Sequence, residues 1–336
     1  MQLDPNEARL LPILEAIRLD PPSGFSLCGQ HVEGEADYAR IPPLGEGSPT
    51  LASTLQAGLY HLCYSRPFRA DATWPAWEGH IDESLIERLS SANAGRDRWD
   101  AGWLVTSVHA ASGIAVAQKF GHSRSFTAGY LLAEGGGAPT AGAMASVFYP
   151  HESRTLQPGF YLIYGETAPP DEHPGNFVRL YWSVDPQGAV ALTALVTARL
   201  NRFEVPFRMK CLTVEKAYDR IDAAVVYVPR RYVNFALRIL HDVPGALAKH
   251  LKGTAPLFTR QLWPGVGLAE DPGTGESFGS HRCRLLAEAV LEAAGKGFQD
   301  TPARLDEVRA GFARNGLDLA RSHLSTSRVD WYALPQ

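Results

Sequence analysis

The sequence predicts an α+β protein: a central antiparallel β region flanked by N-terminal and C-terminal helices. Three observations predict this class. Short apolar or alternating runs, most of them separated by turns with Gly or Pro, fill residues 103–184, as is typical of antiparallel strands. Apolar residues recur at helical spacing before and after this region. The 336 residues are 45% hydrophobic and 20% charged, an ordinary globular balance.

The first hundred residues are predicted to be mostly helical, with one exception. Residues 21–49 are rich in Gly and Pro and predict a loop with little regular structure. Tyr60 and Tyr64 lie one helical turn apart and are expected to pack together. Gly95 follows a helical stretch and suits a left-handed C-terminal conformation. The predicted helices are 5–20, 50–66 and the stretch that ends at SSANAGR.

Two predicted strands carry cations on one face. The first places Arg179 and Tyr181 on one face, and its other face is apolar. The second places Arg208 and Lys210 on one face and Met209 on the opposite one. Two cations on an otherwise apolar strand are costly to bury unless their face borders water or an anion. The two strands therefore predict an anion-binding site, with Lys210 as the best candidate for chemistry.

The C-terminal third predicts helices again. Residues 187–202 and 230–252 have helical patterns, and Pro244 can break the second. A further helix is expected after Thr301 as N-cap, with Pro302 at its first position. We expect residues 1–100 to pack on a catalytic unit of residues 101–336, the two forming one compact body.

A glycine-rich turn, GTGESFGSHR, leads into another amphipathic helix. Free N–H groups and the positive dipole end at such a helix start suit a phosphate, and His281 and Arg282 lie in the first turn. Arg260 lies upstream. A structural helix cap is the alternative interpretation. The turn matches neither a Walker loop nor a dinucleotide fingerprint.

Composition and missing motifs exclude several function classes. A net charge of −4 and a pI near 6.3 disfavour general nucleic-acid binding. Four widely spaced cysteines without a CxxC pair predict free thiols in the cytoplasm. The sequence has no run of 18 apolar residues, so no membrane span is expected. The histidines form no HExxH or HxH motif, so no metal or other cofactor is expected. The buried position expected for Cys211 and the adjacency of Glu270 and Asp271 argue against thiol and glycosidase chemistry.

The remaining candidates are cations and hydroxyls, which suit a phosphate monoester with nearly two negative charges. Arginines bind such a group in a planar fork, whereas a lysine that loses its proton is a competent general base. Asp222 lies close in sequence to these candidates. The candidates are Lys119, Arg179, Lys210, Arg220, Arg260 and Arg282, with Tyr181, Tyr227 and His281.

Several segments resemble the HopA-type effector family. Its first members were type III effectors of plant pathogens, and relatives occur in biosynthetic clusters of class V lanthipeptides and thioamitides. The resemblance runs from about residue 50 to 295 and is most specific over 176–282. The segments that carry it are SSANAGRDRWDAGW, NFVRLYWSV, LNRFEVPFRMKCL, YDRIDAAVVYVP, LFTRQLW and GVGLAEDPGTGESFGSHR.

The resemblance implies a lyase that removes phosphate from phosphoserine or phosphothreonine in a precursor peptide, leaving dehydroalanine or dehydrobutyrine. The peptide would have a leader and a Ser/Thr-rich core. A separate kinase of the aminoglycoside-phosphotransferase type would phosphorylate it. The alternative is a protein that binds a phosphopeptide or a kinase without catalysis.

The order of residues is also similar to that of the bacterial effector phosphothreonine lyases. This similarity implies Lys210 as the base and Tyr181 in the place of a histidine. Either Tyr181 or His281 would then be the general acid, unless cations alone assist the departure of phosphate. Arg179, Arg220 and Arg282 would bind the phosphate, with help from Lys119 and Arg260. Tyr227 and Asp222 would support them.

Overall fold

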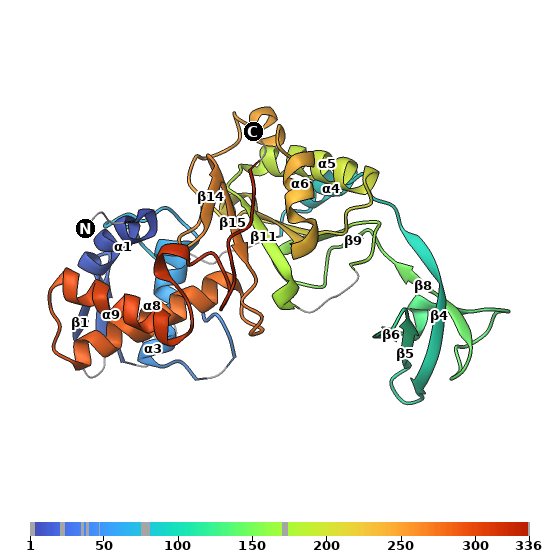
Figure 1. The fold of residues 1–336 in the computed structure, drawn as a ribbon, viewed down its shortest axis with the longest axis horizontal. Coiled ribbons are helices and arrows are strands. Elements are labelled where there is room, and N and C mark those ends of the chain that lie inside the picture. The colour runs from blue at the N-terminus through green and yellow to red at the C-terminus, as the bar shows by residue number, and fades with distance from the viewer. Residues whose placement is uncertain are drawn as a thin grey trace.

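The computed structural model describes residues 4–20, 24–34, 37, 40–46, 48–74, 81–169 and 174–334. Its elements form three parts along the long axis of the molecule: a helical lobe, a seven-stranded sheet and a five-stranded sheet (Figure 1). The predicted α+β class with antiparallel sheets is confirmed. None of the described helices is long and apolar enough to cross a membrane.

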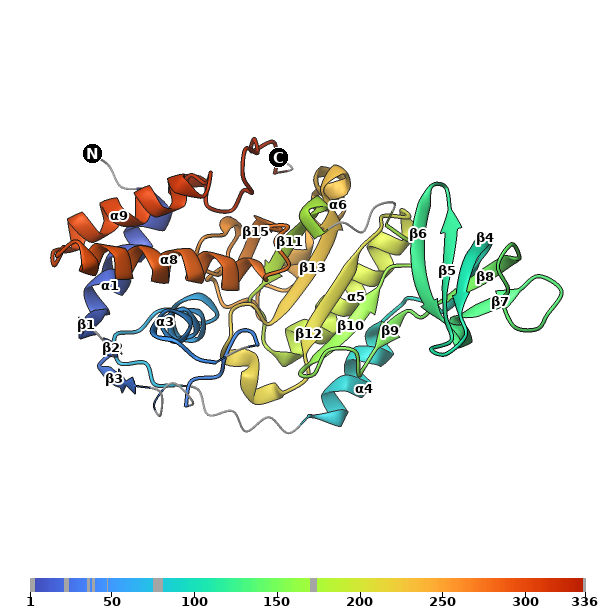
Figure 2. The same cartoon turned by 90° about the horizontal axis from the view of Figure 1, so that it is seen from below.

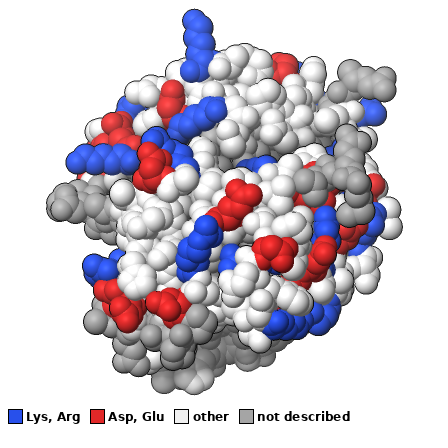
Figure 3. Space-filling model, turned by 90° about the vertical axis from the view of Figure 1, so that its left-hand side faces the viewer, with Lys and Arg blue, Asp and Glu red and all other residues white. Residues whose placement is uncertain are grey.

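The helical lobe combines both ends of the chain. α1 (Pro5–Ala16) packs against α9 (Thr301–Arg314), and α3 (Leu51–Leu59) packs against α8 (Phe278–Gly295). One hydrophobic core joins these four helices. On the end of the molecule that the lobe forms, basic and acidic side chains lie interspersed (Figure 3). The first hundred residues therefore share their core with the last sixty.

The prediction of a loop with little regular structure over 21–49 was wrong for part of that segment. The lobe contains a small antiparallel sheet of β1 (Arg18–Asp20), β2 (Gly24–Leu27) and β3 (Gln30–Glu33). Cys28 and Gly29, both at positive φ, form the turn between β2 and β3. Two consecutive residues at positive φ match the twist of a tight hairpin, and Gly29 adopts this conformation without steric cost.

The seven-stranded sheet forms the middle of the molecule. It has the strand order β14-β15-β11-β13-β12-β10-β9, and every neighbouring pair is antiparallel. α4 (Glu83–Ala92), α5 (Pro186–Arg202) and α6 (Val233–Ile239) cover one face (Figure 1). Its strands are β9 (Glu152–Ser153), β10 (Phe160–Tyr164), β11 (Phe177–Trp182), β12 (Arg208–Leu212), β13 (Ala224–Pro229), β14 (Arg260–Trp263) and β15 (Val266–Glu270).

The five-stranded sheet lies at the far end of the molecule, beyond β9 and α4 (Figure 2). It has its own small hydrophobic core, which includes Trp103 and Val105. The expected division at residue 100 falls inside its first strand. Its strands are β4 (Arg98–His109), β5 (Ile114–Lys119), β6 (His122–Thr127), β7 (Leu131–Ala133) and β8 (Met144–Tyr149).

Two helix ends differ from the predictions, and one predicted helix is broken near Pro244, where the sequence allowed a break. Gly95 is not at positive φ, and Asn93 forms the C-cap of α4. Asp300, rather than Thr301, is the N-cap of α9, because its carboxylate accepts a hydrogen bond from the Ala303 N–H. The predicted helix over 230–252 is broken into a 3₁₀ turn, α6 and α7 (Val243–Ala246).

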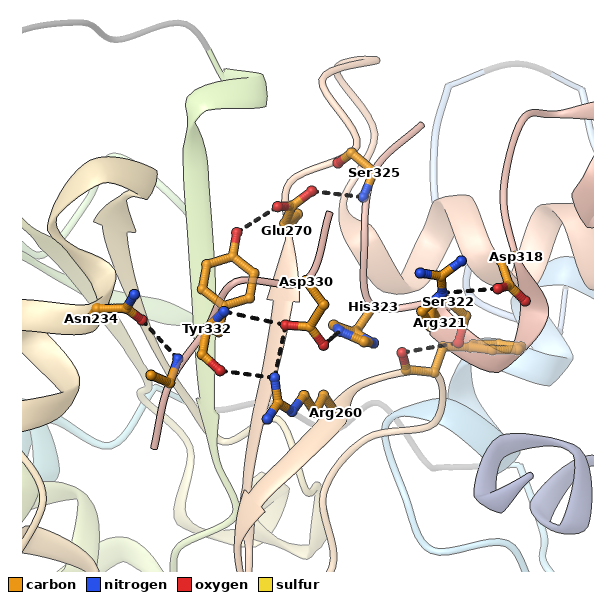
Figure 4. Close-up of polar contacts among 12 residues, drawn as sticks. Asn234, Arg260, Glu270, Asp318, Arg321, Ser322, His323, Ser325, Asp330 and Tyr332 are labelled. Atoms are coloured by element: carbon orange, nitrogen blue, oxygen red, sulfur yellow. Dashed lines mark hydrogen bonds and ion pairs between the residues drawn. The ribbon is translucent and has the colours of Figure 1, made fainter. Parts of the chain in front are cut away.

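The segment after α9 crosses the edge of the seven-stranded sheet (Figure 4). Arg260 of β14 donates hydrogen bonds to the Asp330 carboxylate and the Tyr332 carbonyl, at 2.8 and 3.0 Å. The Tyr332 hydroxyl donates to the buried carboxylate of Glu270, and the Ser325 N–H donates to its other oxygen. These contacts hold the C-terminal segment against β14 and β15.

Candidate active site

The strand register gathers four of the ten predicted site residues on the sheet face opposite α5. On that face, Arg179 of β11 pairs with Tyr227 of β13, which pairs with Arg208 of β12. In the next row, Tyr181 and Lys210 flank Val225. Residues directly opposite each other in antiparallel strands share a face. The prediction that Arg208 and Lys210 lie opposite the apolar side of their strand is confirmed, since Met209 packs in the core under α5.

The helical lobe covers only half of this face. Tyr181 and Val225 are buried against it. On β12 and β10, Arg208, Lys210 and Phe160 stay half-buried. Lys210 therefore lies beside the boundary between the covered and the open half, where a substrate could reach it.

Lys210 has aromatic rings as its neighbours. Its ammonium nitrogen lies 4.2 Å from the centroid of the Phe160 ring and 6.0 Å from that of Tyr227. Within the described part of the chain, this nitrogen makes no hydrogen bond and no ion pair. An ammonium held over ring faces is attracted by the ring quadrupoles without forming an ion pair. Its charge, or its lone pair when deprotonated, is thus available to a ligand.

Arg179, unlike Lys210, forms an ion pair with a carboxylate. Nε and Nη2 of its guanidinium both donate to Oδ2 of Asp271, with Nε at 3.0 Å, and both residues are at most 9% exposed. The Arg179 guanidinium also lies 5.3 Å from the Tyr227 ring centroid. The pair fixes the position of Arg179 and offsets its charge, so an incoming phosphate would share this cation with Asp271.

Arg220 and Asp222 form a second buried pair at the other end of the face. Two hydrogen bonds of 2.8 Å join them, and the Tyr60 hydroxyl bridges to both, at 3.1 Å from Arg220 and 3.3 Å from Asp222. Burial favours the protonated carboxyl, but the charges of Arg220 and Lys210 hold the pKa of Asp222 below its usual value. The pair is therefore ionised at neutral pH and lies within electrostatic reach of Lys210.

Tyr60 and Tyr64 come from a π-helical turn, Tyr60–Tyr64, that continues α3. Their rings stack at 5.2 Å, as the sequence predicted. The Tyr64 ring meets the Tyr181 ring edge-on, with centroids 6.4 Å apart, and also contacts Phe278 of α8. Single π-helical turns often occur at functional sites. This one brings two aromatic hydroxyls from the helical lobe to the sheet face.

The two candidate general acids differ in their ability to donate a proton. Burial raises the pKa of Tyr181 to about 12, against the opposing effect of Arg179, so this phenol keeps its proton at neutral pH. Burial and the Arg282 guanidinium lower the pKa of His281 to about 4. His281 is therefore uncharged at neutral pH, and its Nδ1 accepts a hydrogen bond from Arg282 at 2.7 Å. Of the two, only Tyr181 lies on the face that carries Lys210.

Three predicted phosphate ligands lie elsewhere. Arg282 is fully buried in α8 and donates to the carbonyls of Ser322 and Leu324, at 2.8 Å each, so it holds the C-terminal segment. Arg260 binds the same segment (Figure 4). Lys119 lies in the five-stranded sheet and pairs with Asp100 at 2.9 Å. These three cations are not on the face that carries Lys210. Each lies on an element where its side chain binds another partner: the C-terminal segment for Arg260 and Arg282, and Asp100 for Lys119.

Sequence reasoning missed several residues of this site. Tyr60 and Tyr64 were expected only to pack together, Phe278 was not singled out, and Asp271 was considered only as a glycosidase carboxylate. The partners Arg179 and Asp271 are 92 residues apart, so no local pattern links them. The one available signal was the pair of tyrosines one helical turn apart. In the described part of the chain, no cluster of three His, Cys, Asp or Glu side chains could hold a metal ion.

Comparisons with known proteins place the chain in a family. No curated protein matches it significantly. Two solved structures of effector proteins are similar to this chain. One, from Pseudomonas syringae pv. tomato strain DC3000, is 15% identical in sequence; the match covers 87% of this chain and 96% of that chain, with a TM-score of 0.47. The other, from Pseudomonas syringae pv. syringae strain 61, has 15% identity, 82% and 90% coverage and a TM-score of 0.45. The HopA1 effector protein family model matches residues 151–324, more than half of the chain and all of the seven-stranded sheet. The chain therefore belongs to the HopA1 effector protein family.

Proposed function

We propose that this protein eliminates phosphate from phosphoserine or phosphothreonine in a peptide, leaving dehydroalanine or dehydrobutyrine. The observation that carries the proposal is Lys210, a half-buried lysine without a carboxylate partner among the described residues, on a sheet face that also holds Arg179, Arg208 and Tyr227. A base and nearby cations are the two elements that this reaction requires.

The chemistry needs no further reactant. In its neutral form, Lys210 takes the α-proton of the phosphorylated residue. The electron pair of that C–H bond forms the new double bond between Cα and Cβ. The bond between Cβ and the ester oxygen breaks, and phosphate leaves with its electron pair. Tyr181 keeps its proton at neutral pH and is the donor for the departing oxygen, while Arg179 and Arg220 stabilise the charge that develops on phosphate.

We propose a ribosomally made precursor peptide as the substrate, phosphorylated by a separate kinase of the aminoglycoside-phosphotransferase type. Membership of the HopA1 effector protein family supports this class of substrate. The open half of the sheet face, at β12 and β10, leaves room for a peptide beside Lys210.

A second candidate function is phosphopeptide or kinase binding without catalysis. The observation that favours it is the pairing of Arg179 with Asp271 and of Arg220 with Asp222, which offsets two of the cations. Such a protein would hold its partner and leave the phosphate ester intact.

The test uses a phosphorylated peptide, mass spectrometry and two lysine variants. The wild-type protein is expected to release phosphoric acid, and the Lys210→Ala protein to lose this activity by a factor of about 10² to 10⁴, the usual contribution of a general base. Lys249→Ala, at an exposed lysine outside the site, is the matched control. Elimination at the wild-type rate by Lys210→Ala would sink the proposal. Binding without any mass loss in all three proteins would favour the second function.

A further inference from the structure

A cavity of about 670 Å³ lies in the helical lobe, outside the candidate active site. Its walls are residues of the segments 41–46 and 48–49, the first turns of α3 and the residues that lead into α8. This volume is within the usual range of ligand pockets. The cavity has apolar groups from Ile41 and Leu44 and hydroxyl groups from Ser53 and Ser280.

The wall formed by residues 41–46 is anchored at its base. Ile41 is 3% exposed and belongs to the core of the lobe. The Pro42 carbonyl lies 3.1 Å from Nε2 of His61. On the opposite side, the Gln56 amide donates to the hydroxyl and the carbonyl of Ser280, at 3.0 and 3.1 Å, and so ties α3 to α8. The walls of the cavity are therefore fixed by contacts of their own.

Charge in the cavity disfavours a phosphate. None of its described lining residues is Lys, Arg or His, and two of them, Glu46 and Glu276, are acidic. Arg284 pairs with Glu276 at 3.0 Å, while Glu46 is exposed. The Thr54 hydroxyl, buried in this wall, has no hydrogen-bond partner within the described part of the chain. A ligand with uncharged polar groups next to apolar ones suits this lining.

The cavity and the candidate active site lie along the same helical face. Gln56 and Ala57 line the cavity, and Tyr60 lies one turn further on. Residues three and four apart are neighbours on a helix surface. Tyr60 contacts Arg220 and Asp222 in the candidate active site. α3 and its π-helical turn therefore connect the two sites directly.

We infer that the cavity is a second subsite, which binds an unphosphorylated segment of the same peptide substrate. An apolar side chain of that segment packs against Ile41 and Leu44, and its backbone amides hydrogen-bond with the hydroxyl groups of the wall. The inference rests on the proposed function for the identity of the substrate. It adds that recognition extends beyond the phosphorylated residue, through the helical lobe.

The experiment uses Lys210→Ala protein, to prevent turnover, and a library of long random-sequence peptides with one fixed phosphothreonine at the centre. Retained peptides are sequenced, and one of them is synthesised in full length and as a short form around the phosphothreonine. We expect enrichment of apolar residues several positions from the phosphothreonine. The full-length peptide is expected to bind about tenfold more tightly than the short form, which is the effect of one buried apolar side chain.

Two substitutions fill the cavity from its exposed wall. A side chain at Gly45 meets no atom within 4 Å of its first carbon, and Ser48 is exposed, so Gly45→Trp and Ser48→Trp are each compatible with folding. Each is expected to remove the tenfold advantage of the long peptide and to leave binding of the short one unchanged. Gly245→Trp, at an equally open glycine of α7, is the control and keeps the advantage.

The outcomes separate this inference from the proposed function. Equal affinities of the long and short peptides for the parent protein, or an advantage that survives both substitutions, would overturn the subsite. The wild-type protein is also incubated with the retained peptides. A length advantage that Gly45→Trp removes, together with no release of phosphoric acid by wild type, would overturn the lyase and keep the peptide subsite.

Discussion

Lys210 and Arg179 lie on one sheet face but differ in their partners. Arg179 forms an ion pair with Asp271, whereas the Lys210 ammonium lies over aromatic rings and forms no ion pair with any described residue. The alternation of side chains along a strand predicted the shared face correctly. It could not predict Asp271 as a partner, because that contact depends on how β15 pairs with β11. At the scale of residues, faces follow from local sequence and partners follow from the fold.

The buried pair of Arg179 and Asp271 allows a stability prediction. Asp271→Asn leaves the guanidinium of Arg179 without its counter-charge, in a place that water scarcely reaches. We expect the free energy of unfolding to fall by about 3 kcal/mol, as in other buried pairs that lose one partner. Urea unfolding followed by circular dichroism measures it. The matched control is Asp318→Asn, whose partner Arg321 is exposed, and a cost as small as in that control would contradict the prediction.

His281 allows a prediction on pH. Because its pKa is about 4 in the folded protein and near 6.5 in the unfolded chain, the unfolded state binds more protons between these values. The stability that neutral His281 contributes is complete above pH 6.5 and is lost as the pH falls towards 4. The free energy of unfolding is expected to fall by about 3 kcal/mol over this pH range.

The measurement is urea unfolding at pH 7 and at pH 4.5, for the wild type and for His281→Gln. The glutamine keeps an acceptor for Arg282 but does not titrate. Lowered carboxylate pKa values, such as that of Asp222, add to the acid sensitivity of both proteins. The difference between the two proteins therefore isolates His281, and equal pH dependence would refute its role.

At the scale of elements, the contact between α8 and the π-helical turn depends on one glycine. A Cβ at Gly279 would lie 2.2 Å from an atom of the Tyr64 ring, which is impossible without movement. The ring in turn contacts Tyr181 and Phe278. Gly279 therefore sets how closely α8 packs against the π-helical turn, whose Tyr64 ring contacts Tyr181 on the sheet face.

We expect Gly279→Ala to destabilise the protein by about 1 to 3 kcal/mol, the usual cost of overpacking a core. Gly295, at the end of the same helix, has open space around it, so Gly295→Ala is the control and is expected to be neutral or slightly stabilising. Thermal unfolding of both variants gives the comparison. A Gly279→Ala protein with unchanged Tm would show that the two elements are not packed as described.

Long periodic elements could be predicted from the sequence, but short ones could not. The helices over 187–202 and after residue 277 were predicted within a few residues, since their apolar stripes span several turns. The hairpin of β2 and β3 was missed, because four-residue strands in a Gly- and Pro-rich segment carry little pattern. The division of one β region into two sheets was also not predictable. It depends on pairings between strands far apart in the chain.

At the scale of the whole molecule, the helical lobe is built from both ends of the chain. α1 packs on α9, and Arg304 of α9 donates hydrogen bonds to the Leu14 and Ile17 carbonyls, at 3.2 and 2.9 Å. Leu55 and Leu59 of α3 are fully buried in the same core. The first hundred residues alone contain only about half of the residues of that core.

A fragment of residues 1–100 is therefore expected to remain unfolded. Without α8 and α9 it cannot bury enough apolar surface to offset the entropy of ordering its chain. Circular dichroism of the fragment, alone and mixed with a fragment of residues 101–336, measures this. Helical signal of native intensity in the isolated fragment would contradict the prediction.

The shared core also affects how the protein folds while it is being synthesised. On the ribosome, α1 and α3 emerge early, and their apolar faces have no partner until α8 and α9 have been synthesised. Contacts between residues this distant in the chain form slowly, and exposed apolar surface aggregates in the meantime. Slower translation would lengthen this exposure, so high-yield expression should depend on chaperones that hold the nascent chain.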